Sequence, residues 1–336
     1  MKQRILLSGG TGFLGRYLVA AFCQAGYAQR VLTRRPEAHP WLAQYPELEV
    51  IQGDLRDPSG VQKAAEGCDY VIHAAALFSM WGEASAFYDH NVEGTRNILR
   101  AAQASGVHRL VYVSTVAVIG NPESGAIIDE SYPANPADAY QQSKLDAEQL
   151  VHEMQDAGLP TVILRPGAFY GPLGEYAFNR LFFRDPMRGI IMQMDGGRHI
   201  IFPAYVLDVV QATVAALTLG RVGETYNLCG DCLSHREAFD IVCREARIRY
   251  PRLNLPGFVG LNASRLLTWI AKFTQKEPFW PLNLQSYVFN DWNVSSAKAV
   301  RELGFAPTTF EEGARRTIAW YREGCPALIP ELACAP

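Results

Sequence analysis

The glycines between residues 9 and 15 constrain this chain more than any other feature. They follow a short apolar run at residues 4–8 and precede residues 16–23, where apolar side chains recur at helical spacing. A strand, a glycine turn and a helix in this order let the backbone approach a pyrophosphate, which binds the amides and the positive dipole of the helix N-terminus. The expected contacts in this turn are Gly9, Thr11, Gly12, Phe13, Leu14 and Gly15.

Apolar runs alternate with helix-like segments as far as residue 170. We expect strands at residues 29–33, 48–52, 68–73, 109–113 and 161–165. This rhythm predicts an α/β fold with a doubly wound parallel sheet of the Rossmann type. After Pro172 the rhythm breaks, and helices are expected at residues 206–219, 234–247, 259–273 and 310–321, with a strand at 224–228. We therefore expect an NADP-binding domain at residues 1–170, to which 203–230 return, and a smaller, mostly helical substrate-binding lid at 171–202 and 231–336.

Two arginines at the end of the second expected strand bear on the choice of cofactor. Arg34 and Arg35 stand nineteen and twenty residues after Gly15. An acid at this place holds the ribose 2′-hydroxyl of NAD, whereas an arginine suits the 2′-phosphate of NADP. We expect NADP(H) bound through Arg34, with NAD(H) as the alternative cofactor and two solvated loop arginines as the structural alternative.

Later strand ends supply further candidate contacts. Asp54 and Leu55 follow the third strand, where Asp54 is suited to contact the adenine amino group. The fourth strand ends at His73, which we interpret as a packed, hydrogen-bonded residue. It leads into Ala74, Ala75 and Ala76, whose small side chains leave room for a cofactor at the carboxyl end of a parallel strand.

Composition excludes several other classes of function. A chain of 336 residues with 49% apolar residues can bury a sizeable core, and its formal charge of −3 gives no electrostatic footprint for nucleic acid or an anionic membrane. No stretch reaches the ~20 apolar residues of a spanning helix, so we expect a cytoplasmic protein. Cys229 and Cys232 have no second pair with which to form a metal site, and we expect two buried thiols and no metal.

Tyr140 and Lys144 stand four residues apart in a segment with helical character. At this spacing both side chains leave the same face of a helix, and an ammonium beside a phenol favours the phenolate. Tyr140 is therefore a candidate general acid or base. An isolated pair of this kind is usually an ordinary helix surface, so the pair gains meaning only from the dinucleotide motif before it.

Several motifs together resemble those of the extended short-chain dehydrogenase/reductases, the superfamily that includes NAD-dependent epimerases and dehydratases. They are Ser8–Gly15, Gly53-Asp54-Leu55, Asn91–Thr95, Ser114-Thr115 with Gly120, Tyr140 with Lys144, and Arg165–Pro172. The resemblance follows the order of the family's motifs and is strong over the first half of the chain. It implies that Tyr140 is the catalytic acid/base, that Lys144 binds the nicotinamide ribose and lowers the pKa of Tyr140, and that Asn91 and Pro166 lie at the cofactor.

The resemblance also places a hydroxyl at the substrate oxygen. The family's serine or threonine five residues before the glycine falls on Thr115, which is twenty-five residues before Tyr140. Ser114 is the alternative, and it could instead bond to backbone at the strand end. Homodimerisation is common in the family and is a possible partner interaction here, beside the small-molecule substrate.

The branch of the family depends on other residues. Many sugar-nucleotide enzymes carry an asparagine for the substrate diphosphate where this chain has Ala168. Residues 255–258 and 291–298 also resemble the branch of 3β-hydroxysteroid dehydrogenases, dihydroflavonol reductases and 2-alkyl-3-ketoalkanoate reductases. The expected substrate-pocket residues are Phe78, Met80, Trp81, Phe169 and Tyr170, although these side chains could instead pack the two domains together.

We therefore expect an NADP-dependent oxidoreductase, a ketoreductase or dehydrogenase, that transfers hydride between NADP(H) and a mostly hydrophobic or aromatic carbonyl or alcohol. The alternatives are a nucleotide-sugar epimerase or dehydratase, and a non-catalytic dinucleotide-binding regulator. The helix at residues 259–273 could lie on a membrane or a second subunit, but its basic residues are few, so we expect it to pack on the substrate or in the core.

Overall fold

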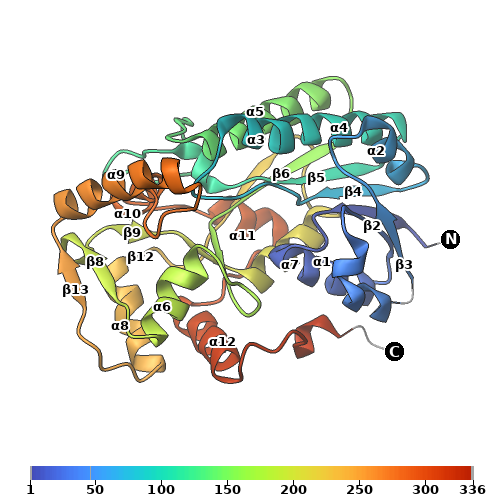
Figure 1. The fold of residues 1–336 in the computed structure, drawn as a ribbon. Helices are drawn as coiled ribbons and strands as arrows, with labels where there is room; N and C mark the ends of the chain where they lie inside the picture. Colours follow the sequence, from blue (N-terminus) through green and yellow to red (C-terminus); the bar gives the residue numbers. More distant parts are fainter. Residues whose placement is uncertain (1, 46, 334–336) are drawn as a thin grey trace.

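A computed structural model describes residues 2–45 and 47–333 and contains a seven-stranded sheet in the order β11-β6-β5-β4-β1-β2-β3 (Figure 1). Every neighbouring pair of these strands is parallel. The strands are β1 (Arg4–Ser8), β2 (Ala28–Thr33), β3 (Leu48–Gln52), β4 (Tyr70–His73), β5 (Arg109–Val113), β6 (Thr161–Pro166) and β11 (Thr225–Leu228). The expected Rossmann-type parallel sheet is confirmed.

Helices cover both faces of the sheet, as Figure 1 shows. One face carries α2 (Pro58–Ala65), α4 (Gly94–Ala104) and α5 (Ala139–Asp156), and the other carries α1 (Phe13–Gln24), α7 (Val206–Ala216) and α11 (Ala297–Leu303). The strands other than the edge strand β3 are buried on both faces, because each helix turns an apolar stripe toward them. The segment before α4 begins as α3 (Ala84–Phe87) and passes through a π-helical segment (Tyr88–Glu93).

The remaining elements form a smaller region beside the carboxyl ends of the strands. Its helices are α6 (Asp185–Met187), α8 (His235–Glu245), α9 (Gly257–Thr274), α10 (Gln285–Val288) and α12 (Phe310–Arg322). Three two-stranded ladders join β7 (Ala168–Tyr170) to β10 (Pro203–Tyr205), β9 (Ile200–Ile201) to β12 (Leu233–Ser234), and β8 (Met192–Met194) to β13 (Leu253–Leu255). This region has its own apolar core, in which the rings of Tyr170, Phe183 and Phe310 pack together.

Two expectations about this region are wrong. Cys229 is buried at the end of β11, but Cys232 is exposed, because the chain has already turned outward at Asp231. The helix expected at residues 259–273 is present as α9, but the expectation that it is core is wrong, because most of its large apolar side chains are exposed. Its packing on a substrate stays a prediction.

The strand order reverses at β1, whose neighbours are β2 on one side and β4 on the other. Ligands of open α/β sheets bind outside the carboxyl ends of the strands at such a reversal. The glycine turn after Ser8 and the alanines after His73 both lie at this edge, because Ser8 and His73 are paired in register. The fold therefore places the candidate site above β1 and β4.

Candidate active site

Tyr140 and Lys144 lie in the first turns of α5. Asp138 caps this helix, since its carboxylate accepts a hydrogen bond from the Gln141 amide at 2.8 Å. Tyr140 is 9% exposed and Lys144 is 2% exposed, so the helix presents both side chains to the interior. The alternative considered above, that Tyr140 and Lys144 are ordinary exposed residues on a helix surface, does not fit this burial.

The ammonium of Lys144 is held against the end of β5. Its Nζ donates to the Val113 carbonyl oxygen at 2.9 Å and lies 4.3 Å from the centre of the Tyr112 ring. Burial lowers the pKa of Lys144 to about 7, against the opposing effect of the Glu148 carboxylate. Glu148 itself forms a buried ion pair with Arg165 at 2.6 Å.

The pKa of Tyr140 is shifted in the direction opposite to the expected one. Burial raises the pKa of the Tyr140 phenol, and the carboxylate of Asp138 raises it further. Loss of solvent is the larger cause of this shift, and Lys144 is not among its causes, so the expected lowering of this pKa by Lys144 stays a prediction. Tyr140 is held in its protonated form at neutral pH, which is the form that donates a proton.

The two candidate hydroxyls after β5 differ in their partners. Thr115 caps the short helix Val116–Ile119, since its Oγ1 accepts from the Ala117 amide at 3.1 Å. Its O–H remains available to donate a second hydrogen bond. The Oγ of Ser114 is buried and has no hydrogen-bond partner among the described residues. The expected bond from Ser114 to backbone is not present, so both hydroxyls stay candidates.

The glycine turn has the shape that a pyrophosphate requires. A Cβ on Gly15 would lie 1.9 Å from the Gly9 carbonyl oxygen, and one on Gly9 would lie 2.6 Å from the Ala75 amide nitrogen. Helix α1 begins after Gly12, whose lack of a side chain leaves the first-turn amides without a side-chain cap. Because these amides carry the positive end of the helix dipole, the turn fits a dinucleotide.

A buried hydrogen-bond network supports this edge of the sheet. His73 is fully buried, and its ring nitrogens bond to Ser8 Oγ at 2.6 Å and to Thr95 Oγ1 at 2.9 Å. Burial lowers the pKa of His73 to about 3, so the ring is neutral at pH 7. His73 thus packs as the sequence predicts and ties β1 to β4 and α4.

Asn91 bridges the loop after β4 to the catalytic helix. Its amide exchanges hydrogen bonds with the backbone of Leu77, and its Nδ2 donates to Ser143 Oγ at 2.9 Å. Ser143 donates in turn to the Tyr140 carbonyl oxygen. The side chain of Asn91, predicted to lie at the cofactor, bonds to protein groups and joins the loop after β4 to the first turn of α5.

The other expected cofactor residues line the same edge. Arg34 is exposed, and Asp54 is held by a two-point ion pair with Arg56 that lowers the pKa of Asp54 to about 2. Leu55 lies against Gly94 of α4, where a Cβ would come within 3.2 Å of it. Ala74 and Ala75 are half-buried, Ala76 is exposed, and Pro166 is buried at the end of β6.

Aromatic rings gather around Tyr140. The exposed ring of Phe78 lies 4.9 Å from the ring of Tyr140 and 5.7 Å from that of Tyr176. The Tyr176 hydroxyl accepts from the Met80 amide and donates to the Glu277 carboxylate. Sequence reasoning missed Tyr176, because it stands in an irregular segment with no periodicity and no motif.

The sequence left two roles open for the other expected pocket residues, which are to line the substrate pocket or to pack the two domains together. Met80 is buried, and Trp81 and Phe169 are half-buried. Tyr170 is 1% exposed and its ring packs against Phe178, Phe183, Tyr205 and Phe310. Its placement is that of a packing residue between the sheet and the C-terminal region.

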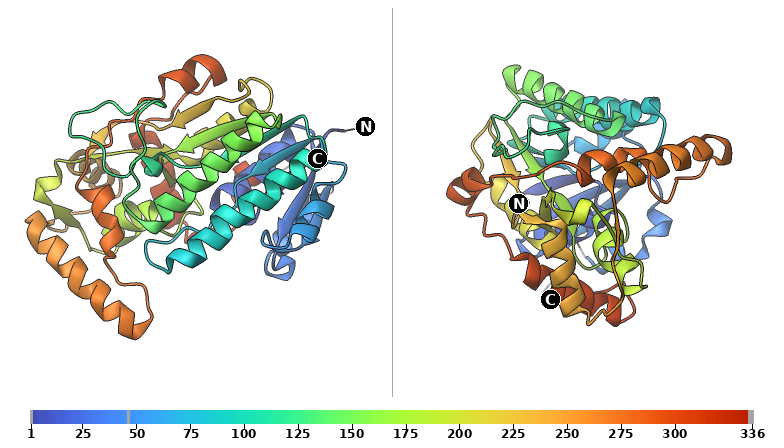
Figure 2. Two further views of the ribbon diagram at one scale, coloured as in Figure 1. Left: turned by 90° about the horizontal axis from the view of Figure 1, so that it is seen from above. Right: turned by 90° about the vertical axis from the view of Figure 1, so that its left-hand side faces the viewer.

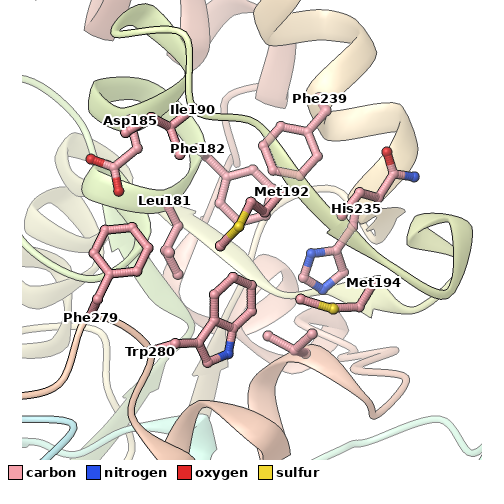
Figure 3. Close-up of a pocket in the computed structure, with 12 residues that line it drawn as sticks. Leu181, Phe182, Asp185, Ile190, Met192, Met194, His235, Phe239, Phe279 and Trp280 are labelled. Carbon is pink, nitrogen blue, oxygen red and sulfur yellow. The ribbon is translucent and has the colours of Figure 1, made fainter. Parts of the chain in front are cut away.

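A separate apolar cavity lies in the C-terminal region (Figure 3). Met192, Met194, Phe239, Phe279 and Trp280 are among its lining residues. His235 also faces it, and the Nε2 atom of this histidine is buried without a partner among the described residues. None of the expected catalytic residues lines the cavity, so the chemistry belongs to the sheet edge.

The fold and this site define an NAD(P)-dependent oxidoreductase of the extended short-chain dehydrogenase/reductase type. The chain belongs to the NAD dependent epimerase/dehydratase family, whose model matches residues 5–229. It is 31% identical to a 4-hydroxy-2-methyl-3-oxo-4-farnesyl-3,4-dihydroquinoline-1-oxide ketoreductase of Stigmatella aurantiaca, over 90% of this chain and 92% of that protein. It is 34% identical to a 3 beta-hydroxysteroid dehydrogenase/Delta 5-->4-isomerase of Mycobacterium tuberculosis, over 95% of this chain and 90% of that protein.

The structural comparison agrees with this assignment. The crystal structure of gox2253 superimposes with a TM-score of 0.81 at 27% identity and covers 96% of this chain and 99% of its own. None of the helices that the structure describes has both the length and the apolar composition needed to cross a bilayer. Within the same residues, no three His, Cys, Asp or Glu side chains are grouped as metal ligands.

Proposed function

We propose that this protein is an NADP-dependent ketoreductase or dehydrogenase that acts on a mostly hydrophobic or aromatic carbonyl compound or alcohol. One observation carries the proposal: the ring of Tyr140, buried beside Lys144 on α5, is covered by the exposed ring of Phe78. A phenol that can donate a proton beside an apolar ring suits a substrate whose carbonyl group is attached to a hydrophobic or aromatic group.

The residues have separate roles in this proposal. Tyr140 donates its proton to the carbonyl oxygen during reduction and accepts a proton during oxidation. Thr115 donates a hydrogen bond to the same oxygen, with Ser114 as the alternative donor. Lys144 and the Gly9–Gly15 turn hold the cofactor, which supplies the hydride when it is bound. Because the pKa of Tyr140 is raised, the phenol is protonated at neutral pH, which is the form that reduction of a carbonyl requires.

The choice of NADP rests on the charges around Asp54. The Asp54 carboxylate is paired with Arg56. This ion pair offsets the negative charge that would repel a 2′-phosphate, and it occupies the oxygens that would accept a hydrogen bond from a ribose hydroxyl. Arg34 lies close enough to lower the pKa of Asp54 and is exposed at the end of β2. Two arginine side chains at this corner suit a 2′-phosphate better than a 2′-hydroxyl.

The substrate class rests on the apolar surroundings of the site. The ketoreductase and the hydroxysteroid dehydrogenase named above act, by their names, on compounds with large apolar bodies. Residues 171–202 and 231–336 would form a substrate-binding lid over the cofactor domain at 1–170 and 203–230.

A nucleotide-sugar epimerase or dehydratase is the second candidate, and the family's own description favours it. The test is oxidation of free NADPH, followed at 340 nm, with a panel of aryl, alkyl and steroid ketones, beside chromatography of UDP- and dTDP-sugars incubated with the enzyme. We expect a ketone to consume NADPH faster than NADH and the sugars to be recovered unchanged. Conversion of a sugar without net use of NADPH would replace the proposal with the second candidate.

A further inference from the structure

Helix α9 is oriented unlike an ordinary surface helix, because most of its large apolar side chains are exposed and the residues that it buries are small. Gly260, Ser264 and Ala271 are its buried residues. Phe273 is 71% exposed, Phe258 69%, and both Leu266 and Trp269 57%. Surface helices normally turn their bulky apolar face inward, so this arrangement leaves a large unpaired apolar surface.

The exposed side chains form one continuous stripe. At about 100° per residue, Phe258, Val259, Leu266, Trp269, Ile270 and Phe273 fall within about a third of the helix circumference. The opposite side is held close to the protein, since a Cβ on Gly260 would lie 2.6 Å from the sulfur of Met194. Figure 2 shows α9, in orange, along one end of the molecule and projecting beyond its body.

Every charged residue from position 246 to 276 is basic, and the nearest acidic neighbours of α9 are at its ends, where Asp195 accepts a hydrogen bond from the Gly257 amide and Glu277 follows the helix. No Asp or Glu occurs between Glu245 and Glu277, whereas this interval contains Arg247, Arg249, Arg252, Arg265, Lys272 and Lys276. Arg252 is paired with Asp240, but neither Arg265 nor Lys272 has an ion-pair partner among the described residues. These two residues are seven apart, so they border the same edge of the stripe. The chain's net charge of −3 hides this local excess.

We propose that α9 binds the surface of an anionic lipid bilayer, with its apolar stripe in the headgroup and acyl boundary and its basic edge on the lipid phosphates. Trp and Phe on one face and Lys and Arg beside them are what such a surface binds. A second copy of this chain is a less suitable partner for the apolar stripe of α9. A two-fold interface would bring two basic edges together with no acidic residue in the interval to offset them.

The position of α9 connects this surface to the active site. Glu277 follows the helix by three residues and accepts the hydrogen bond of the Tyr176 hydroxyl. The Tyr176 ring in turn contacts Phe78, which covers Tyr140. If the proposed function holds, a bilayer on α9 would place the mouth of the site beside the phase in which apolar ketones concentrate. The binding surface itself does not depend on that function.

The test is co-sedimentation of the full-length protein with vesicles of phosphatidylcholine alone and of phosphatidylcholine with 30 mol% phosphatidylglycerol. We expect binding to the anionic vesicles, weak binding to the neutral ones, and loss of binding as salt rises. Arg265→Gln with Lys272→Gln should lower the partition coefficient roughly 30-fold. Leu266→Asp with Phe273→Asp should lower it by at least about tenfold.

Matched variants separate this surface from general effects. Arg100→Gln removes an exposed arginine from α4, and Leu219→Asp charges a leucine that is 57% exposed after α7. Both should bind vesicles like the wild type. No vesicle binding by the wild type, or equal binding by the α9 variants, would overturn the proposal. So would a dimer, seen by sedimentation velocity, that Phe273→Asp converts to a monomer, because a second copy would then cover the stripe.

Discussion

The ring of Phe78 lies 4.9 Å from the ring of Tyr140, with the two planes inclined by 59°. Tyr140 is almost fully buried, whereas Phe78 is 41% exposed. Phe78 therefore forms the outer wall of the candidate site, and Tyr140, the proposed proton donor, forms its inner wall. This relationship joins the loop after β4, which the parallel sheet positions, to the cap of α5.

Phe78→Ala should weaken substrate binding more than it slows the chemistry. Removing an apolar wall loses the contact with the substrate but leaves Tyr140 and Lys144 in place, so we expect KM for aromatic ketones to rise about tenfold with a smaller fall in kcat. Steady-state kinetics with NADPH saturating measure both constants. Tyr250→Ala, which removes a ring that is 59% exposed elsewhere, is the control, and an equal effect there would refute the assignment.

Thr115→Val should lower kcat at least about 100-fold, because valine keeps the shape of threonine but offers no hydrogen bond to the substrate oxygen. The same change removes the cap on the Ala117 amide and should lower the free energy of unfolding by about 1 kcal/mol. Thr115→Ser should restore both properties, and Ser114→Ala should change kcat less than tenfold. If Ser114→Ala proves the more harmful substitution, Ser114 is the hydroxyl at the substrate oxygen.

Arg34→Ala should reduce kcat/KM with NADPH by roughly 10- to 100-fold and leave the value with NADH nearly unchanged. The reason is that, in the proposed assignment, the exposed Arg34 guanidinium binds the 2′-phosphate, the one group that distinguishes the two cofactors. Initial rates with each cofactor and one ketone give the ratio, and Arg100→Ala serves as the control for loss of a surface charge. An equal loss with both cofactors would remove Arg34 from the specificity argument.

Lys144 should make the unfolding free energy depend on pH. Burial lowers the pKa of Lys144 to about 7 from the ordinary 10.5, so between these values the unfolded chain binds more protons than the folded protein. Stability should therefore rise with pH across this window, by up to about 1.4 kcal/mol per pH unit, relative to Lys144→Met. Urea unfolding at pH 6 to 10 of wild type and variant measures the difference.

The exposed Lys63 of α2 provides the matched control for this measurement. Lys63→Met should keep the wild-type pH dependence, because that ammonium is solvated in both states. If the unfolding free energies of the wild type and Lys144→Met change with pH in the same way, then folding does not lower the pKa of Lys144, and the prediction is wrong.

Periodicity and motif order predicted the sheet well, because both are local properties of the chain. The run at residues 48–52 coincides with β3, and the glycines at 9 and 15 are needed where Cβ atoms would collide with backbone. Properties that depend on distant partners were not predictable. The pKa of Tyr140 follows from burial that Phe78 and Phe87 help to create, and the spacing from Tyr140 to Lys144 contains no information about burial.

The same limit explains Tyr176 and α9. Tyr176 belongs to the site through contacts with Phe78, Met80 and Glu277, which lie about a hundred residues away on either side. The amphipathic pattern of residues 257–274 is visible in the sequence, but which face meets the protein is not. Gly260 sits against Met194, so the small face turned inward and the aromatic face outward.

The most direct test of the central claim is a single-turnover comparison of wild type and Tyr140→Phe. Excess enzyme is mixed with NADPH and a ketone that the wild type reduces, and NADPH oxidation is followed at 340 nm while cofactor binding is measured separately by fluorescence titration. We predict a rate lower by roughly 10²- to 10⁴-fold with an NADPH dissociation constant close to that of the wild type. A rate within a few-fold of the wild type would contradict the assignment of Tyr140 as the proton donor.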